Sequence, residues 1–386
     1  MRILFLAPDV SLEEQDGQAA HVIGISRALQ DLGHDLLVLV GAAKVQTLAA
    51  SDIPIRVIRN RGNGSREDAW QSAISFRPDV VYERRATPKL GLRLSRRLRV
   101  GYFLEINGIV DFERGFGRRQ WLSGMRWRRN GILRRCEHFV VPSNGLAVRL
   151  SSIHGIPLDR FSIIPNGVDL SAFRETDKIE SRKILGWPLD RPILVFAGKL
   201  VGWQGLFTLL DAISLSEFRS RVWVALVGDG PLASEIANQI RERGLEETVK
   251  LTGPRPHSEV PLILSAGDLC IAPFTSERNS KIEISPLKLF EYMASGRAVV
   301  ASDVPGVKGI LRDAGLTVPP DSATELARAI DVLLRDPGRM QEMGHKGVQY
   351  SQRSSWKERG EILAQLLLKS ASVQGREDSV GAIRHS

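Results

Sequence analysis

Residues 283–291 read EISPLKLFE, with a glutamate at each end and a serine–proline pair between them. The pair Ser285-Pro286 predicts a helix start, because a serine side chain can cap the first turn and proline fits the first helical position. An apolar run follows, as a helix packed against a core requires. Glu283 therefore precedes the predicted helix, whereas Glu291 lies about one and a half turns inside it.

The start of this predicted helix is a candidate anion site. Backbone N–H groups near Leu287 and Lys288 would point at the ligand, and the helix dipole favours negative charge there. A diphosphate fits such a site, and carboxylates on either side would accept hydrogen bonds from sugar hydroxyls. The stretch therefore indicates a nucleotide-sugar site. The spacing alone leaves open a second interpretation, in which Glu283 and Glu291 are solvated charges flanking an ordinary helix.

Length and composition narrow the class of protein. A chain of 386 residues with 43% hydrophobic and 25% charged residues is typical of a globular protein with two domains. Cys136 and Cys270 are too far apart to suggest a metal site or a disulfide framework, which favours a reducing cytoplasm. The first residues are too short an apolar run for a signal peptide, and no run reaches the length of a membrane span. The net charge of +9 favours anionic partners, of which nucleic acid, acidic lipid and nucleotides all qualify.

Short apolar runs alternate with helical segments along the chain. In the first part they are ILFLA, DLLVLV, VVYER, YFLEIN and HFVVPS; in the second they are PILVFAG, VWVALVGDG, VKLTG, LCIAPF and AVVAS. Continuous apolar strands are typical of a parallel sheet covered on both faces. A segment with Pro165, Asn166 and Gly167 separates the two arrays. The pattern predicts two doubly wound α/β domains facing a cleft.

Several segments together resemble retaining glycosyltransferase family 4, which has the GT-B fold. In their order along the chain they are PNGVDLSAF, VFAGKLVGWQG, LVGDGPLASEI and SPLKLFEYMASGRAVVASDVPG. Residues 283–291 are similar to its E-x7-E motif. The resemblance implies an acceptor-side domain over residues 1–168 and a nucleotide-sugar-binding domain over 169–353. It also implies a helix over 354–372 that crosses back to the first domain. We expect the polar tail over 373–386 to be disordered.

The resemblance assigns roles to residues of the second domain. Glu283 would contact the transferred sugar and Glu291 the ribose. The arginine and lysine that clamp the diphosphate in the family fall on Lys199 and Gln204, so one charge is lost, and Lys288, Lys281 or Arg278 could replace it. The full donor-binding set is Gly17, Gln204, Arg255, Leu287, Lys288 and Glu291.

In the first domain, Gly17 matches the second glycine of the family's GG loop, with Asp16 in place of the first. Asn107 stands near the position where many members have a histidine. Glu105, Asn107 and Arg84 are therefore site candidates, although Glu105 and Asn107 could also only cap a loop. The residues assigned to the chemistry are Glu283, Lys199, Asn107 and Glu105. We assign His21 and His34 structural roles.

A basic segment over residues 113–138 mixes arginine with tryptophan and leucine, which is typical of a membrane interface. The predicted membrane-contact residues are Arg118, Arg119, Trp121, Arg126, Trp127, Arg128 and Arg129. The alternative is a solvated basic loop and helix. We expect the protein to be cytoplasmic and peripheral on the inner face of the cytoplasmic membrane.

The resemblance implies transfer of a sugar, with retention, from a UDP- or GDP-sugar to a hydroxyl of a lipid-linked or polysaccharide glycan, with no metal and no cofactor. The alternative is a non-catalytic nucleotide-sugar-binding member, because Gln204 lacks the clamp charge. A sugar phosphorylase or nucleotide-sugar epimerase on the same fold is a further possibility. A nucleic-acid partner is not expected, because no recognisable binding module is present. A dinucleotide oxidoreductase is disfavoured, because no G-x-G-x-x-G follows the first strand.

Overall fold

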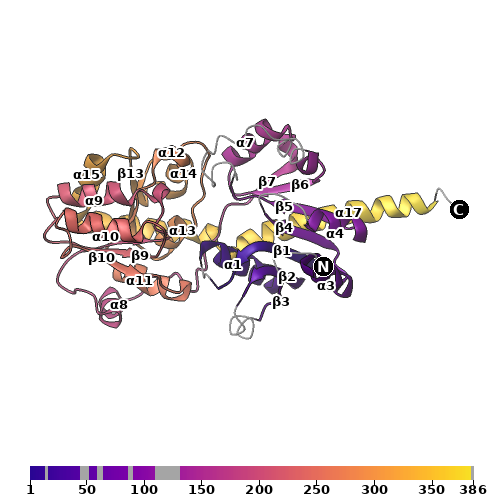
Figure 1. The fold of residues 1–386 in the computed structure, drawn as a ribbon, viewed down its shortest axis with the longest axis horizontal. Coiled ribbons are helices and arrows are strands. Elements are labelled where there is room, and N and C mark those ends of the chain that lie inside the picture. Colours follow the sequence, from indigo (N-terminus) through magenta and orange to yellow (C-terminus); the bar gives the residue numbers. More distant parts are fainter. Residues whose placement is uncertain (14–15, 44–51, 59–63, 86–89, 109–130, 384–386) are drawn as a thin grey trace. The chain divides into compact units, whose positions relative to one another are not determined.

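The computed structural model describes residues 1–386 except 14–15, 44–51, 59–63, 86–89, 109–130 and 384–386. The chain forms two compact units (Figure 1), the first from Met1–Pro165 with Trp356–Ser386 and the second from Asn166–Ser355. The sequence predicted boundaries at 168/169 and 353/354, within three residues of these positions.

The first unit is built on a parallel sheet in the order β3-β2-β1-β4-β5-β6-β7. Its strands are β1 (Arg2–Ser11), β2 (Asp35–Ala42), β3 (Ile55–Val57), β4 (Val80–Arg84), β5 (Gly101–Glu105), β6 (His138–Val141) and β7 (Phe161–Ile163). Its helices are α1 (Gly17–Asp31), α3 (Gly64–Phe76), α4 (Leu90–Leu98), α7 (Asn144–His154), η2 (Leu158–Arg160) and α17 (Trp356–Ile383). The strand order reverses between β1 and β4, which makes that point the switch point of the sheet.

The second unit has a parallel sheet in the order β10-β9-β8-β11-β12-β13. Its strands are β8 (Ile193–Ala197), β9 (Trp223–Val227), β10 (Val249–Gly253), β11 (Leu269–Ala272), β12 (Ala298–Ser302) and β13 (Gly315–Val318). Its helices are α8 (Lys178–Leu185), η3 (Gly202–Gln204), α9 (Leu206–Leu215), α10 (Ala233–Glu242), η4 (His257–Glu259), α11 (Val260–Ala266), α12 (Ser276–Asn279), α13 (Leu287–Ala294), α14 (Val307–Leu311), α15 (Ala323–Leu334), α16 (Pro337–Ser351) and η5 (Gln352–Ser354). The switch point lies between β8 and β11.

The second sheet buries both of its faces. Alternate strand residues such as Leu194 and Phe196 pack with α9, α10 and α15, whereas Ile193 and Val195 pack with α11, α13 and α14. Because side chains alternate along a strand, a sheet covered on both faces requires apolar residues at every position. The continuous apolar runs that predicted a doubly wound domain are therefore confirmed.

Helix α17 packs against α1 within the first unit. The approach is close, because a Cβ atom added to Gly24 would lie 2.5 Å from the Trp356 indole, and one added to Gly360 would lie 2.6 Å from the Ala28 Cβ. The helix continues to Ile383, through most of the segment that we expected to be disordered.

Candidate functional site

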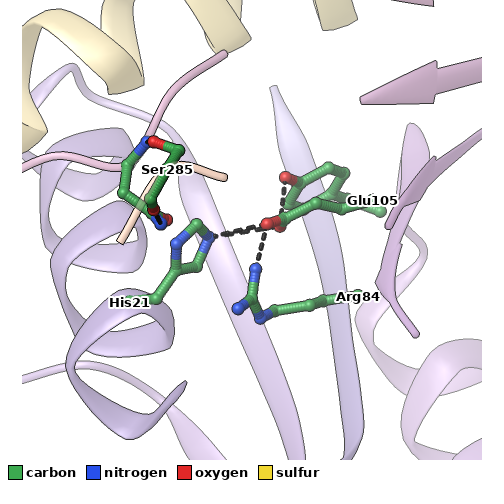
Figure 2. A network of polar contacts seen from close by, with 6 residues as sticks. His21, Arg84, Glu105 and Ser285 are labelled. Atoms are coloured by element: carbon green, nitrogen blue, oxygen red, sulfur yellow. Dashed lines mark hydrogen bonds and ion pairs between the residues drawn. The ribbon is translucent and has the colours of Figure 1, made fainter. Parts of the chain in front are cut away.

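The first unit gathers polar side chains where β4 and β5 end, next to the switch point of its sheet. Glu105 is the last residue of β5 and is buried, with 3% of its surface exposed. Its carboxylate accepts a hydrogen bond from the Tyr82 hydroxyl at 2.6 Å and forms an ion pair with Arg84, the last residue of β4. The His21 Nε2 atom, from α1, lies 2.9 Å from Glu105 Oε1. Figure 2 shows His21 and Arg84 converging on this carboxylate.

Glu105 is held as a carboxylate. Burial would raise its pKa, but the charges of Arg84 and His21, together with the hydrogen bonds from His21 and Tyr82, outweigh burial and lower the pKa to about 2. An ionised carboxylate fixes the ring orientation of His21, and the same ring makes a T-shaped contact with the Trp356 indole at 5.0 Å between centroids. The site thus presents an oriented imidazole beside a buried anion.

Two predicted site residues of the first unit lie near this cluster in sequence. Asn107 is exposed, two residues beyond Glu105. Gly17 is the first residue of α1 and is exposed, but the preceding Asp16 caps that helix, with Oδ1 accepting from the backbone N–H groups of Gln18 at 2.9 Å and Ala19 at 3.1 Å. A phosphate at this helix start would therefore compete with the protein's own carboxylate for these two amides.

In the second unit, the predicted helix start is found with one correction. Helix α13 begins at Leu287, and Pro286 is its N-cap, without a side-chain hydrogen bond. Ser285 is therefore not the cap that the sequence predicted, because its Oγ accepts from the backbone N–H of Asn166 at 3.4 Å and its carbonyl accepts from the Asn166 side chain at 2.6 Å. The first-turn amides have no side-chain cap, as an anion site requires.

A lysine from α13 reaches the side chain at position 204. The ammonium group of Lys288 donates to the Gln204 Oε1 atom at 2.8 Å and lies 3.9 Å from the centroid of the Phe196 ring. Gly198, at φ +151°, leaves room for it, because a Cβ atom there would lie 2.7 Å from the Lys288 Nζ. Burial lowers the pKa of Lys288 from 10.5 to about 7, against the opposing effect of Glu291.

The remaining predicted donor residues lie on loops and on α13. Lys199 is exposed and follows β8 at the carboxyl edge of the sheet. Arg255 is exposed, and its guanidinium lies 3.5 Å from the Glu259 carboxylate. Glu283 is half-buried, on a segment that the Ile284 N–H fixes to the Pro305 carbonyl at 2.9 Å.

Glu291 is buried inside α13 and has a partner that the sequence analysis missed. The His257 Nε2 atom lies 2.7 Å from Glu291 Oε1, and the His257 ring packs against Phe173 at 5.4 Å between centroids. His21 was likewise assigned a structural role, and the structure places it against Glu105. Neither pairing could be predicted, because each joins residues 34 or 84 positions apart with no local motif.

The seven predicted membrane-contact residues, from Arg118 to Arg129, lie outside the described residues. No helix in the described part of the chain is long and apolar enough to cross a membrane. Within the same described ranges, no group of histidine, cysteine, aspartate and glutamate residues is arranged to hold a metal ion.

Two doubly wound parallel domains, each with polar groups at its switch point and joined by a helix that returns to the first, define the GT-B architecture. The model for Glycosyltransferase Family 4 matches residues 15–172, and the model for Glycosyl transferases group 1 matches residues 177–350. The two models together match most of the chain. The chain therefore belongs to the GT-B glycosyltransferases of the family 4 type, as the sequence predicted.

Similar proteins include a D-inositol 3-phosphate glycosyltransferase from Thermobispora bispora, 28% identical over 61% of this chain and 56% of that protein. The putative teichuronic acid biosynthesis glycosyltransferase TuaC from Bacillus subtilis is 35% identical over 44% of this chain and 40% of that protein. The matches thus span about half the length of these relatives. The crystal structure of Anabaena HepE in complex with UDP covers 96% of this chain and 100% of its own, with a TM-score of 0.78 and 21% identity.

Proposed function

We propose that the protein is a retaining glycosyltransferase that moves a sugar from a nucleoside-diphosphate sugar to a hydroxyl of a lipid-linked or polysaccharide glycan. The observation that carries the proposal is the pairing of Lys288 with Gln204 at the uncapped start of α13, with Glu291 one turn further along the helix. A cation, free helix-start amides and a buried carboxylate in this order suit a diphosphate followed by a ribose.

In the proposed reaction, the bond between the anomeric carbon and the diphosphate oxygen breaks, and the acceptor oxygen bonds to the same face of that carbon. The departing diphosphate oxygen takes the acceptor proton. Lys288, Lys199 and the start of α13 would stabilise the charge on the leaving diphosphate, and Glu283 would hold the transferred sugar. Glu105, with His21 and Asn107, would serve the acceptor side.

The second candidate is a non-catalytic protein that binds nucleotide-sugars. The loss of charge at Gln204 favours it, because charge-assisted hydrogen bonds are about twice as strong as neutral ones. The position of the Lys288 amine, 2.8 Å from the Gln204 side chain, weakens it, because a group that can carry a positive charge beside a bound diphosphate still lies at that point. We therefore propose an enzyme and not only a binding protein.

For the acceptor, we propose a glycan assembled on an anionic membrane surface at the inner face of the cytoplasmic membrane. Helix α4 supports this proposal, because Arg93, Arg96 and Arg97 are exposed on it while Leu92 and Leu94 are buried. Each basic residue near an anionic surface contributes on the order of 1 kcal/mol. TuaC is named for teichuronic acid biosynthesis, which agrees with a cell-envelope polysaccharide.

The donor proposal is tested by thermal unfolding with UDP, GDP, ADP and their sugars, beside a Glu291→Ala variant. A ligand at 100 times its Kd adds about 2.7 kcal/mol, which raises the Tm of a domain of this size by several degrees. We expect one nucleotide to raise the Tm of the wild type and to lose this effect in the variant. No shift with any nucleotide would contradict the donor class.

Turnover and membrane contact have separate tests. Release of the nucleoside diphosphate from the donor, with an acceptor present, would separate an enzyme from a binding protein. Co-sedimentation with phosphatidylglycerol vesicles at low salt would test the membrane surface, and exchange of the three exposed α4 arginines for glutamine should weaken it. Failure to sediment at low salt would contradict the membrane proposal and leave the donor proposal untouched.

A further inference from the structure

The pair His257–Glu291 is a contact within the second unit that no motif indicated. Glu291 is buried, with 9% of its side chain exposed, and its Oε1 atom lies 2.7 Å from the His257 Nε2 atom. His257 is half-buried at the start of η4, and Phe173, itself buried, packs against its ring. Helix η4 thus brings a histidine, packed against Phe173, to the carboxylate of α13.

The geometry decides how the hydrogen is placed. An ionised carboxylate only accepts hydrogen bonds, so the Nε2 atom of His257 must carry a hydrogen at this distance. A packed aromatic ring that donates one hydrogen bond fixes the direction of the carboxylate, as partners of metal-binding and catalytic groups do. One oxygen of Glu291 is then engaged by His257, and Oε2 is the oxygen left to accept from a ligand.

Lys288 is a second possible partner for the same carboxylate. It lies one turn earlier on α13, and although burial lowers the pKa of Lys288 to about 7, the charge of Glu291 opposes this lowering, so the two groups interact. Residues three apart on a helix are neighbours. Without His257, the Glu291 carboxylate would turn toward Lys288, and that cation would be drawn from Gln204.

We propose that His257 is a positioning residue that holds Glu291 so that Oε2 faces the ribose, and that it thereby sets the preference for a ribonucleotide over a deoxyribonucleotide. The proposal rests on the proposed function, because it assumes that a nucleoside diphosphate binds at α13. It adds a residue to the site and a specificity that the donor class alone does not imply.

The test compares the Kd values of the diphosphate that the wild type binds, UDP or GDP, and of its 2′-deoxy analogue by titration calorimetry. A hydrogen bond to a charged group is worth on the order of tenfold or more in affinity, so we expect the wild type to prefer the ribonucleotide by about that factor. His257→Phe keeps the contact with Phe173 but has no donor, and it should lower the preference to about twofold or less. His257→Gln restores a donor and should recover most of it.

The matched control is His345→Phe, because His345 is an exposed histidine on α16. This control should keep the wild-type preference, and the Tm of each variant shows whether it folds. Unchanged preference in a folded His257→Phe variant would overturn the inference, as would a His257→Gln variant that behaves like His257→Phe. If the wild type binds the ribonucleotide and its 2′-deoxy analogue equally well, this inference is wrong but the proposed function still stands. Absence of any nucleotide binding would instead remove the proposed function on which it rests.

Discussion

The proposed diphosphate site should take up a proton when it binds its ligand. The Lys288 ammonium packs over the Phe196 ring and donates to the side-chain amide oxygen of Gln204, and burial lowers the pKa of Lys288 to about 7. A group with this pKa is about 90% neutral at pH 8. A diphosphate beside it would raise the pKa toward the ordinary value of 10.5, because an opposite charge favours the charged form. Binding at pH 8 should therefore take up about 0.9 proton.

The sign of the pH dependence follows from the same shift. Below pH 7 most of the free protein already carries the charged lysine, and above it the proton must be acquired on binding. The affinity should therefore fall as pH rises, by about 50-fold between pH 7 and pH 9. Titration calorimetry with UDP or GDP in buffers of different ionisation enthalpy at pH 8 measures the uptake directly. The terminal phosphate, with a pKa near 6, contributes little at that pH.

Two variants separate Lys288 from other titrating groups. Lys288→Arg keeps a charge at every pH of the experiment and should bind without proton uptake. Lys288→Met removes the charge and should bind weakly at all pH values. Equal proton uptake in the wild type and Lys288→Arg would refute the assignment, because another group would then be its source. Tight binding by Lys288→Met would show that Lys288 is not the diphosphate cation.

Three further predictions concern stability. Glu105→Gln should lower the free energy of unfolding by about 3 kcal/mol at pH 7. Because the pKa of Glu105 is lowered from its ordinary value of 4.5 to about 2 in the folded protein, the difference measured by urea unfolding should shrink as the pH falls below about 4.5. Burial raises the pKa of Glu83 to about 7, so this residue destabilises the folded state increasingly from pH 4.5 to pH 7. The Tm of Glu83→Gln should therefore rise relative to the Tm of the wild type over that range. Gly360→Val should cost about 1–3 kcal/mol, because its Cβ would meet Ala28, whereas Gly309→Ala, with open space around it, should not lower the Tm.

The sequence predicted most strands of both sheets because they are short, continuous apolar runs. It missed β3 and β7, which have three residues each, and β13, which has four, too few for a periodic signal. Strand β7 ends two residues before Pro165, and the proline–glycine signal there predicted a linker for the whole stretch. The start of α13 was misplaced by one residue, because the Ser285 hydroxyl is engaged by Asn166, 119 positions earlier in the chain.

The site was predicted only as far as local spacing carries information. Glu291 and Lys288 could be predicted as candidates because they lie at fixed positions on one helix with a recognisable start. The partners of the same groups, His257 and Gln204, come from the 3-10 helices η4 and η3, and their distances of 2.7 and 2.8 Å depend on how the fold brings these elements to α13. Sequence reasoning registered Gln204 as a loss of charge, because it compared single positions and could not see which side chain reaches that point.

The structure gives that loss a different meaning. The Gln204 Oε1 atom lies 2.8 Å from the Lys288 Nζ atom, and a lysine at position 204, whose side chain is one bond longer, would bring a second amine to the same point. Two amines that are both protonated repel each other in a partly buried site. A glutamine there instead accepts a hydrogen bond and orients the remaining cation. The two positions are therefore best understood as a coupled pair. Gln204→Lys should accordingly weaken rather than strengthen diphosphate binding, unless Lys288 is exchanged for glutamine at the same time, and a single Gln204→Lys variant that binds UDP or GDP more tightly would contradict this coupling.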